Sequence, residues 1–112
     1  YPKVPFGLVE DTDDSVISFF YGFGADNCTG ITQLSQDTFT AGLLDERTRP
    51  AQYPNVGGFI FQGTDHTTLS SATFDTRTAG GDGAEGGTPT ATNLTDWVAT
   101  LVNSGTVTNV GP

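Results

Sequence analysis

The stretch VPFGLVEDTDDS, residues 4–15, joins an apolar half to an acidic half. Its first half, Val4–Val9, is a nearly continuous apolar run, as in a buried strand of a parallel sheet, and Pro5 is acceptable there only because it stands near the start. The acidic loop Glu10–Asp14 ends the run, and an acid or Ser15 caps the helix that follows. The stretch therefore predicts a strand, a polar turn and a helix, in that order.

Helix and strand alternate in the residues that follow. Apolar residues at helical spacing predict helices over 16–23, about 35–47 and about 94–102. The last of these is capped by Thr92 or Asn93 and ends at Gly105. A second buried strand is expected at Phe59-Ile60-Phe61. A helical crossover between two apolar strands is the sequence form of a parallel βαβ unit.

The fold class is therefore α/β, with parallel strands and flanking helices. Two parallel strands leave a sheet open on both sides, whereas parallel sheets normally have several strands and covered faces. We expect residues 1–112 to be the C-terminal part of a single domain that is incomplete without an upstream segment or a partner chain. The Gly-rich residues 79–89 are expected to form a flexible loop.

Charge and composition exclude several classes of partner. Thirteen acids stand against four bases, a net charge of −9, and the bases form no patch that could neutralise phosphates. Nucleic acid and acidic membrane surfaces are therefore not expected as partners. The abundant Thr, Ser, Asn and Gly, with one Lys and no Met, indicate a secreted or extracellular protein. The single Cys28 is either a buried thiol or paired with another chain.

His66, the only histidine, follows the second predicted strand, and the acidic loop follows the first. Because the carboxyl ends of parallel neighbours meet at one edge, a carboxylate could there hold an imidazole's tautomer. The alternative is that His66 is a polar loop residue and the acids a solvated turn. Calcium is disfavoured because the loop lacks the glycine and distal glutamate of an EF-hand. We expect no metal ion and no cofactor.

A serine nucleophile is not recognisable. An α/β-hydrolase carries its serine in a Gly-x-Ser-x-Gly elbow, followed along the chain by the acid and then the histidine. No serine of this chain has that context, and Cys28 is better read as a structural thiol than as a nucleophile. An acid followed by a histidine, without the serine, is what the C-terminal part of such an enzyme contains.

Four stretches in order carry a resemblance to a known family. The chain resembles the C-terminal part of bacterial pectinacetylesterase-family hydrolases, an α/β-hydrolase branch related to plant pectin acetylesterases and to Notum. The likeness spans nearly the whole chain. The stretches are Val4–Val9 with Asp13-Asp14-Ser15-Val16 and Phe19-Phe20-Tyr21; Phe59-Ile60-Phe61-Gln62-Gly63 with Asp65-His66-Thr67; Phe74 with Thr76; and Leu94-Thr95-Asp96-Trp97-Val98 with Leu101, Val102, Gly105 and Asn109-Val110.

The resemblance implies a secreted serine-type carboxylesterase. Asp14 would be the triad acid, with Asp13 and Asp11 as fallback acids, and His66 the triad histidine. The serine would lie in an upstream segment or second chain, so the isolated chain would be inactive. An ester such as an acetylated polysaccharide would be hydrolysed through an acyl-enzyme.

Two other interpretations remain open from the sequence. The chain could be a non-catalytic extracellular structural or interaction module whose histidine and acids are incidental. It could also be the smaller chain of an enzyme cut before Tyr1, with Cys28 joining the two pieces.

Overall fold

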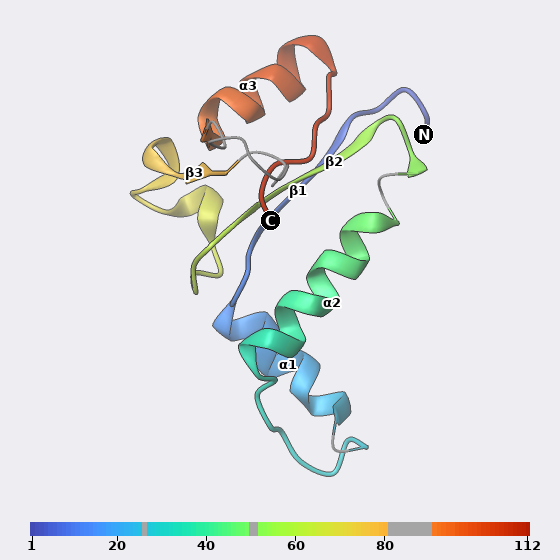
Figure 1. Ribbon diagram of the computed structural model, residues 1–112, viewed down its shortest axis with the longest axis vertical. Helices are drawn as coiled ribbons and strands as arrows, with labels where there is room; N and C mark the ends of the chain where they lie inside the picture. The colour runs from blue at the N-terminus through green and yellow to red at the C-terminus, as the bar shows by residue number, and fades with distance from the viewer. Residues whose placement is uncertain (26, 50–51, 81–90) are drawn as a thin grey trace, which may run out of the picture.

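The computed structural model describes residues 1–25, 27–49, 52–80 and 91–112 (Figure 1). Two strands and three helices make up most of it, together with two single-turn 3-10 helices at Thr68–Ser70 and Phe74–Thr76 and one short antiparallel pair. The main elements are β1 (Phe6–Asp11), α1 (Ser15–Ala25), α2 (Gln36–Thr48), β2 (Val56–Phe61), β3 (Thr78–Ala79), β4 (Thr92–Asn93) and α3 (Leu94–Ser104).

β1 and β2 pair in parallel, from Phe6 opposite Val56 to Asp11 opposite Phe61. The predicted α/β class with a parallel βαβ unit is therefore confirmed. The parallel sheet has two strands in the described residues, as expected, and one position on the second edge of β2 is bridged by Val110. The amide of Ile60 donates to the Val110 carbonyl over 2.9 Å, and the Val110 amide donates to Gly58.

Helices lie on both faces of the parallel pair, with α3 on one side and α1 and α2 on the other (Figure 1). Side chains alternate along β1, so Gly7 faces α3 while Leu8 faces α1 and α2. Gly7 is required there, because a Cβ atom would stand 2.6 Å from the Trp97 ring. Trp97 packs on Phe59 with ring centroids 5.7 Å apart, and this contact is the centre of the core.

The ends of α3 agree with the sequence prediction. Asn93 caps the helix through a 2.8 Å bond from the Thr95 amide, and Gly105 ends it in the left-handed conformation, with φ 68°. Its apolar stripe faces the core through Leu94 and Trp97.

The apolar stripe of α1 behaves differently. Phe20 is 67% exposed, and Phe19 and Phe23 are also exposed. Within the described residues nothing covers this side of α1. A helix with so much bare aromatic surface is typical of an element that packs against further structure.

The first strand lies two residues later in the chain than predicted, at Phe6–Asp11 instead of Val4–Val9. Glu10 and Asp11 pair with Ile60 and Phe61 and belong to β1, so the predicted acidic loop is reduced to Thr12–Asp14. Pairing with an apolar neighbour strand outweighs the low strand propensity of the acids. The two acids consequently point to opposite faces of the sheet.

Cys28 is exposed, so the first of its two alternatives, a buried thiol, is wrong. Most of the Gly-rich stretch predicted as a flexible loop lies outside the described residues. No helix in the described ranges combines the length and apolar character needed to cross a membrane.

Candidate functional site

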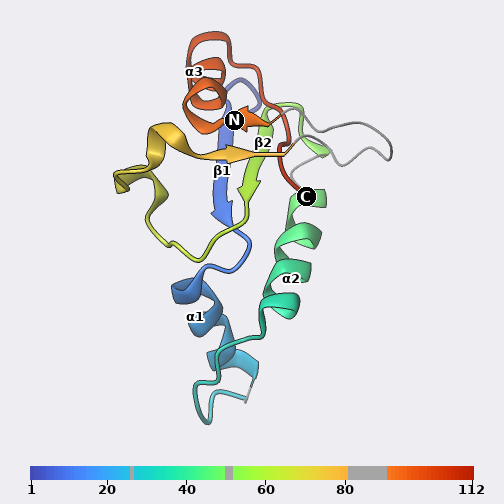
Figure 2. The ribbon, with the colours of Figure 1, turned by 60° about the vertical axis from the view of Figure 1, so that its left-hand side comes forward.

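The carboxyl ends of β1 and β2 lie side by side and lead into α1 and into the loop that carries His66 (Figure 2). Backbone pairing continues beyond the strands, with the Thr12 amide donating to Phe61 over 2.9 Å and the Asp13 amide donating to Gly63 over 3.0 Å. The two loops are thereby held in register. His66 and Asp14, which are 52 residues apart in the chain, meet at this edge.

His66 donates from Nδ1 to Oδ2 of Asp14 over 2.8 Å. The Asp14 side chain is 1% exposed and the His66 side chain 41% exposed. A carboxylate can only accept, so this bond fixes the proton on Nδ1 and leaves Nε2 as an acceptor. This arrangement orients a histidine for general-base chemistry.

The other oxygen of Asp14 caps α1. Oδ1 accepts from the amides of Val16 and Ile17, over 2.9 and 2.7 Å. These amides belong to the first turn, where the helix has no internal acceptors for them. The Asp14 carboxylate is therefore held by the α1 backbone through one oxygen while the other oxygen accepts from His66.

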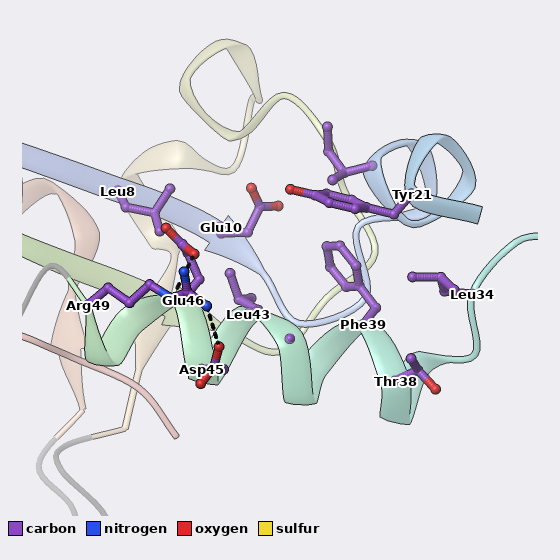
Figure 3. Close-up of a pocket in the computed structure, with 12 residues that line it drawn as sticks. Leu8, Glu10, Tyr21, Leu34, Thr38, Phe39, Leu43, Asp45, Glu46 and Arg49 are labelled. Atoms are coloured by element: carbon purple, nitrogen blue, oxygen red, sulfur yellow. Dashed lines mark hydrogen bonds and ion pairs between the residues drawn. The ribbon is translucent and has the colours of Figure 1, made fainter. Parts of the chain in front are cut away.

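Glu10 supplies a second carboxyl group close to that of Asp14. Its side chain extends from β1 toward Tyr21 of α1, at the inner end of a cavity of about 390 Å³ between β1, α1 and α2 (Figure 3). Burial, followed by hydrogen bonding to Asp14 and repulsion from it, raises the pKa of Glu10 from 4.5 to about 7.

Asp14 keeps its charge in this pair. Its burial acts to raise the pKa, but bonds from the Ile17 amide, His66, Glu10 and the Val16 amide outweigh burial and lower the pKa of Asp14 below its ordinary 3.8. Below a pH of about 7 this pair of carboxyl groups therefore carries one proton, and the proton is on Glu10. Asp14 is left ionised beside His66.

A hollow of about 600 Å³ opens beside His66, along the side of β1 that does not face β2. Its walls come from the middle of β1 and from the segment that follows the histidine. The residues lining it are Gly7, Leu8, Val9, His66, Thr67, Thr68, Leu69 and Ser70.

None of the six serines is hydrogen-bonded to His66. Ser70 lines the hollow, but its hydroxyl donates to the Thr67 carbonyl over 3.2 Å. Ser15 donates to the Thr64 carbonyl, and Ser18 accepts from Gln33. The remaining hydroxyls bond within their own turns, at Ser35, Ser71 and Ser104.

The two fallback acids lie elsewhere. The Asp13 side chain makes no hydrogen bond or ion pair within the described residues, and only its amide is engaged. Asp11 is fully buried on the opposite face of the sheet, near Arg77. Of the three candidate acids, the structure brings only Asp14 to His66.

Two charged residues at this edge had not been singled out from the sequence. The sequence prediction places Glu10 in the acidic loop. In a strand that includes Glu10 and Asp11, alternation of side chains puts the two residues on opposite faces. Arg77 carries no sequence signal, because its partners Asp11 and Asp65 lie 66 and 12 residues away.

Across the described ranges, no three His, Cys, Asp or Glu side chains gather in a way that could hold a metal ion. The acids of the predicted acidic loop do not gather in one place, because the two that belong to β1 point to opposite faces of the sheet. Comparisons with protein-family models, with curated proteins and with solved structures find no match for this chain.

Proposed function

We propose that this chain supplies the acid and the histidine of a serine-type carboxylester hydrolase whose nucleophile lies outside these 112 residues. The observation that supports this most directly is the 2.8 Å bond from His66 Nδ1 to Asp14, whose carboxylate is buried and capped by the start of α1. A buried acid and a half-exposed imidazole that is bonded to it through Nδ1 are two of the three parts of a triad.

The mechanism assigns one role to each residue. Nε2 of His66 takes the proton from a serine hydroxyl as that oxygen attacks the ester carbonyl, and returns the proton to the departing alcohol. Asp14 holds the tautomer and stabilises the imidazolium that forms. Water then attacks the acyl-enzyme with His66 as base, which releases the acid and regenerates the serine.

The hollow beside His66 suits the approach of the missing parts. It runs along the side of β1 that pairs with no strand in the described part of the chain, and additional sheet there would place further residues near the imidazole. The exposed aromatic surface of α1 supports the same proposal, since a complete α/β domain would cover it. The partner is thus an upstream segment or a second chain of the same protein.

The substrate class and location are proposed from the family resemblance. An acetylated polysaccharide is the proposed substrate and release of acetate the proposed reaction, in a secreted protein. The solvent-facing His66 suits a bulky polymeric substrate, because the acyl group alone needs to enter the site.

The test is fluorophosphonate labelling of the native protein, followed by mass spectrometry of the labelled peptide. We expect one labelled serine outside these residues, and loss of labelling in His66→Gln. Asp13→Asn is the matched control, because it removes an adjacent carboxylate that has no hydrogen bond or ion pair in the described structure, and it should label normally. An unlabelled native protein would contradict the proposal and favour a non-catalytic interaction module.

A further inference from the structure

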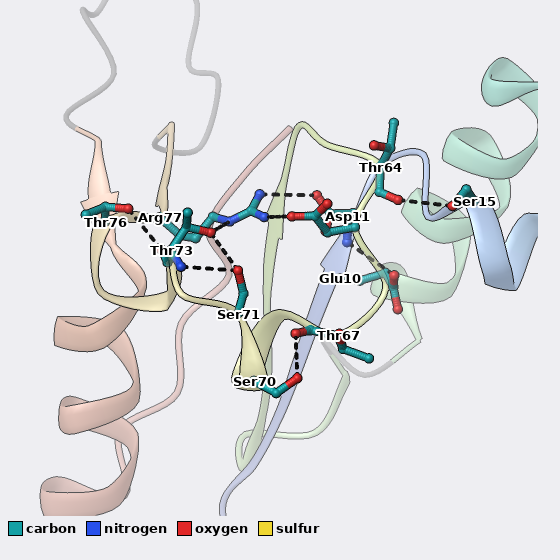
Figure 4. Close-up of polar contacts among 11 residues, drawn as sticks. Glu10, Asp11, Ser15, Thr64, Thr67, Ser70, Ser71, Thr73, Thr76 and Arg77 are labelled. Atoms are coloured by element: carbon teal, nitrogen blue, oxygen red, sulfur yellow. Dashed lines mark hydrogen bonds and ion pairs between the residues drawn. The ribbon is translucent and has the colours of Figure 1, made fainter.

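Arg77 contacts two acids. One lies at the end of β1, and the other lies in the loop that follows β2. Its Nη1 lies 3.8 Å from Oδ1 of Asp11, and its Nη2 is bonded to Oδ2 of Asp65. Its Nε donates to the Thr73 hydroxyl over 3.2 Å, as Figure 4 shows. The guanidinium stands 4.8 Å from the centre of the Phe61 ring, and the side chain is only 18% exposed. This arginine is therefore held on several sides and cannot move freely.

Asp11 explains why a cation is needed at this position. The side chain is fully buried, and neither carboxylate oxygen has a hydrogen-bond partner within the described residues. An uncompensated buried carboxylate is strongly unfavourable, so the nearby guanidinium is its main compensation. Asp11 in turn fixes where the Arg77 head group lies.

The second acid, Asp65, immediately precedes His66. Backbone bonds between the two loops extend only as far as Thr64, whose carbonyl accepts from Ser15 over 3.4 Å. After Thr64 the loop is held by side chains. Arg77 holds Asp65, and Asp14 holds His66.

We propose that Arg77 is a positioning residue that anchors the His66 loop to the end of β1 through Asp65 and so keeps the imidazole on Asp14. This inference rests on the proposed function for its significance, but its physical content is independent of any reaction. Arg77 touches neither the imidazole nor the hollow, and acts on His66 through the residue before it. A guanidinium suits this role because its fork can engage two carboxylates at once.

The decisive variant is Asp65→Asn in the native protein labelled with ¹⁵N-histidine. Asp65 is 55% exposed, so the substitution leaves the Asp11–Arg77 contact and the core intact. Long-range ¹H–¹⁵N spectra at alkaline pH report which ring nitrogen carries the proton, and His66→Gln identifies the signals of this residue. We expect the ratio of the Nδ1–H to the Nε2–H form to fall about fivefold, with an unchanged unfolding midpoint.

Two further variants separate positioning from general charge and stability effects. Asp75→Asn removes the same charge from an exposed residue near Arg77 that is not bonded to it, and should keep the native ratio. Arg77→Lys keeps a positive charge near Asp11 but cannot fork between two acids. It should fold and still show the reduced ratio.

An unchanged tautomer ratio in both Asp65→Asn and Arg77→Lys would overturn the inference, as would a wild-type His66 protonated mainly on Nε2. A reduced ratio only in variants with a lowered unfolding midpoint would also overturn it, because the effect would then be structural. If the ratio responds as expected while no serine takes a fluorophosphonate, the positioning role stands and the proposed esterase function fails.

Discussion

Gly63 lies so close to Asp11 that no side chain can be added to it without displacing the buried carboxylate. A Cβ atom built on Gly63 would overlap Oδ1 of Asp11 and stand 3.3 Å from Nη1 of Arg77. The glycine that follows β2 is thus required by the acid that ends β1.

Gly63→Ala should therefore destabilise the protein by about 2 kcal/mol, because Asp11 or the His66 loop must shift. The same shift should lower fluorophosphonate labelling by about 10²-fold if the esterase proposal holds. Urea unfolding and labelling rates measure the two effects separately. Gly42→Ala is the control, and it should raise the free energy of unfolding instead of lowering it. A Cβ on Gly42 meets nothing within 4 Å, and α2 should gain about 1 kcal/mol.

Asp14 has a structural and a chemical role that two substitutions can separate. Asparagine caps helices as well as aspartate does, so Asp14→Asn should retain the stability of α1. It cannot stabilise the imidazolium, and labelling should fall about 10⁴-fold. Asp14→Ala loses the cap as well and should cost a further 1 to 2 kcal/mol, roughly, in urea unfolding. Normal labelling in Asp14→Asn would remove Asp14 from the proposed triad.

Stability should decrease as pH rises from about 4.5 to about 7. Glu10 has a pKa raised to about 7, so the folded state holds a proton that the unfolded state releases near 4.5. Asp11, whose burial raises its pKa from 3.8 to about 6, acts in the same direction, although Arg77 opposes the effect. The lowered pKa of Asp14 acts oppositely, with stability lost only in strong acid.

Glu10→Gln isolates the contribution of Glu10. A glutamine resembles the protonated acid and can still donate to Asp14, so the variant should be more stable than wild type by roughly 1 to 2 kcal/mol at pH 8. No gain is expected at pH 4.5. The exposed Glu46→Gln serves as control and should not alter the slope. Parallel stability curves for wild type and Glu10→Gln between pH 4.5 and 7 would contradict the assignment.

The aromatic surface of α1 gives a test of whether more of the domain covers it. In the native protein, Phe20→Ser should cost about 2 kcal/mol, because the ring is then buried. Val102→Ser, on an exposed position of α3, should change stability by less than about 0.5 kcal/mol. Equal, negligible effects in urea unfolding would mean that α1 faces solvent in the native protein as well.

The sequence predicted the elements whose apolar residues form a continuous run or repeat at helical spacing. Continuous apolar runs located β1 and β2, and the spacing of Leu94, Trp97 and Leu101 located α3 with its caps. The two 3-10 turns and the β3–β4 pair were missed, because two or three residues are too few to carry a period.

The site was predictable only in part. The parallel pairing placed His66 near the acidic loop, but spacing alone could not choose among Asp11, Asp13 and Asp14. That choice depends on where β1 ends, since each added residue reverses the face of the next side chain. Arg77 was unpredictable because an ion pair between distant residues leaves no local pattern.

The two edges of the parallel pair differ in how many backbone groups they leave available to a further strand. Val110 contributes one bridged residue to β2, and Gly111 then turns the chain with φ 113°, where a Cβ would overlap the Ile60 carbonyl. An incoming strand finds no continuous ladder on that side. Among the described residues β1 pairs with no strand other than β2, so a further strand would find a full-length row of backbone groups only along β1.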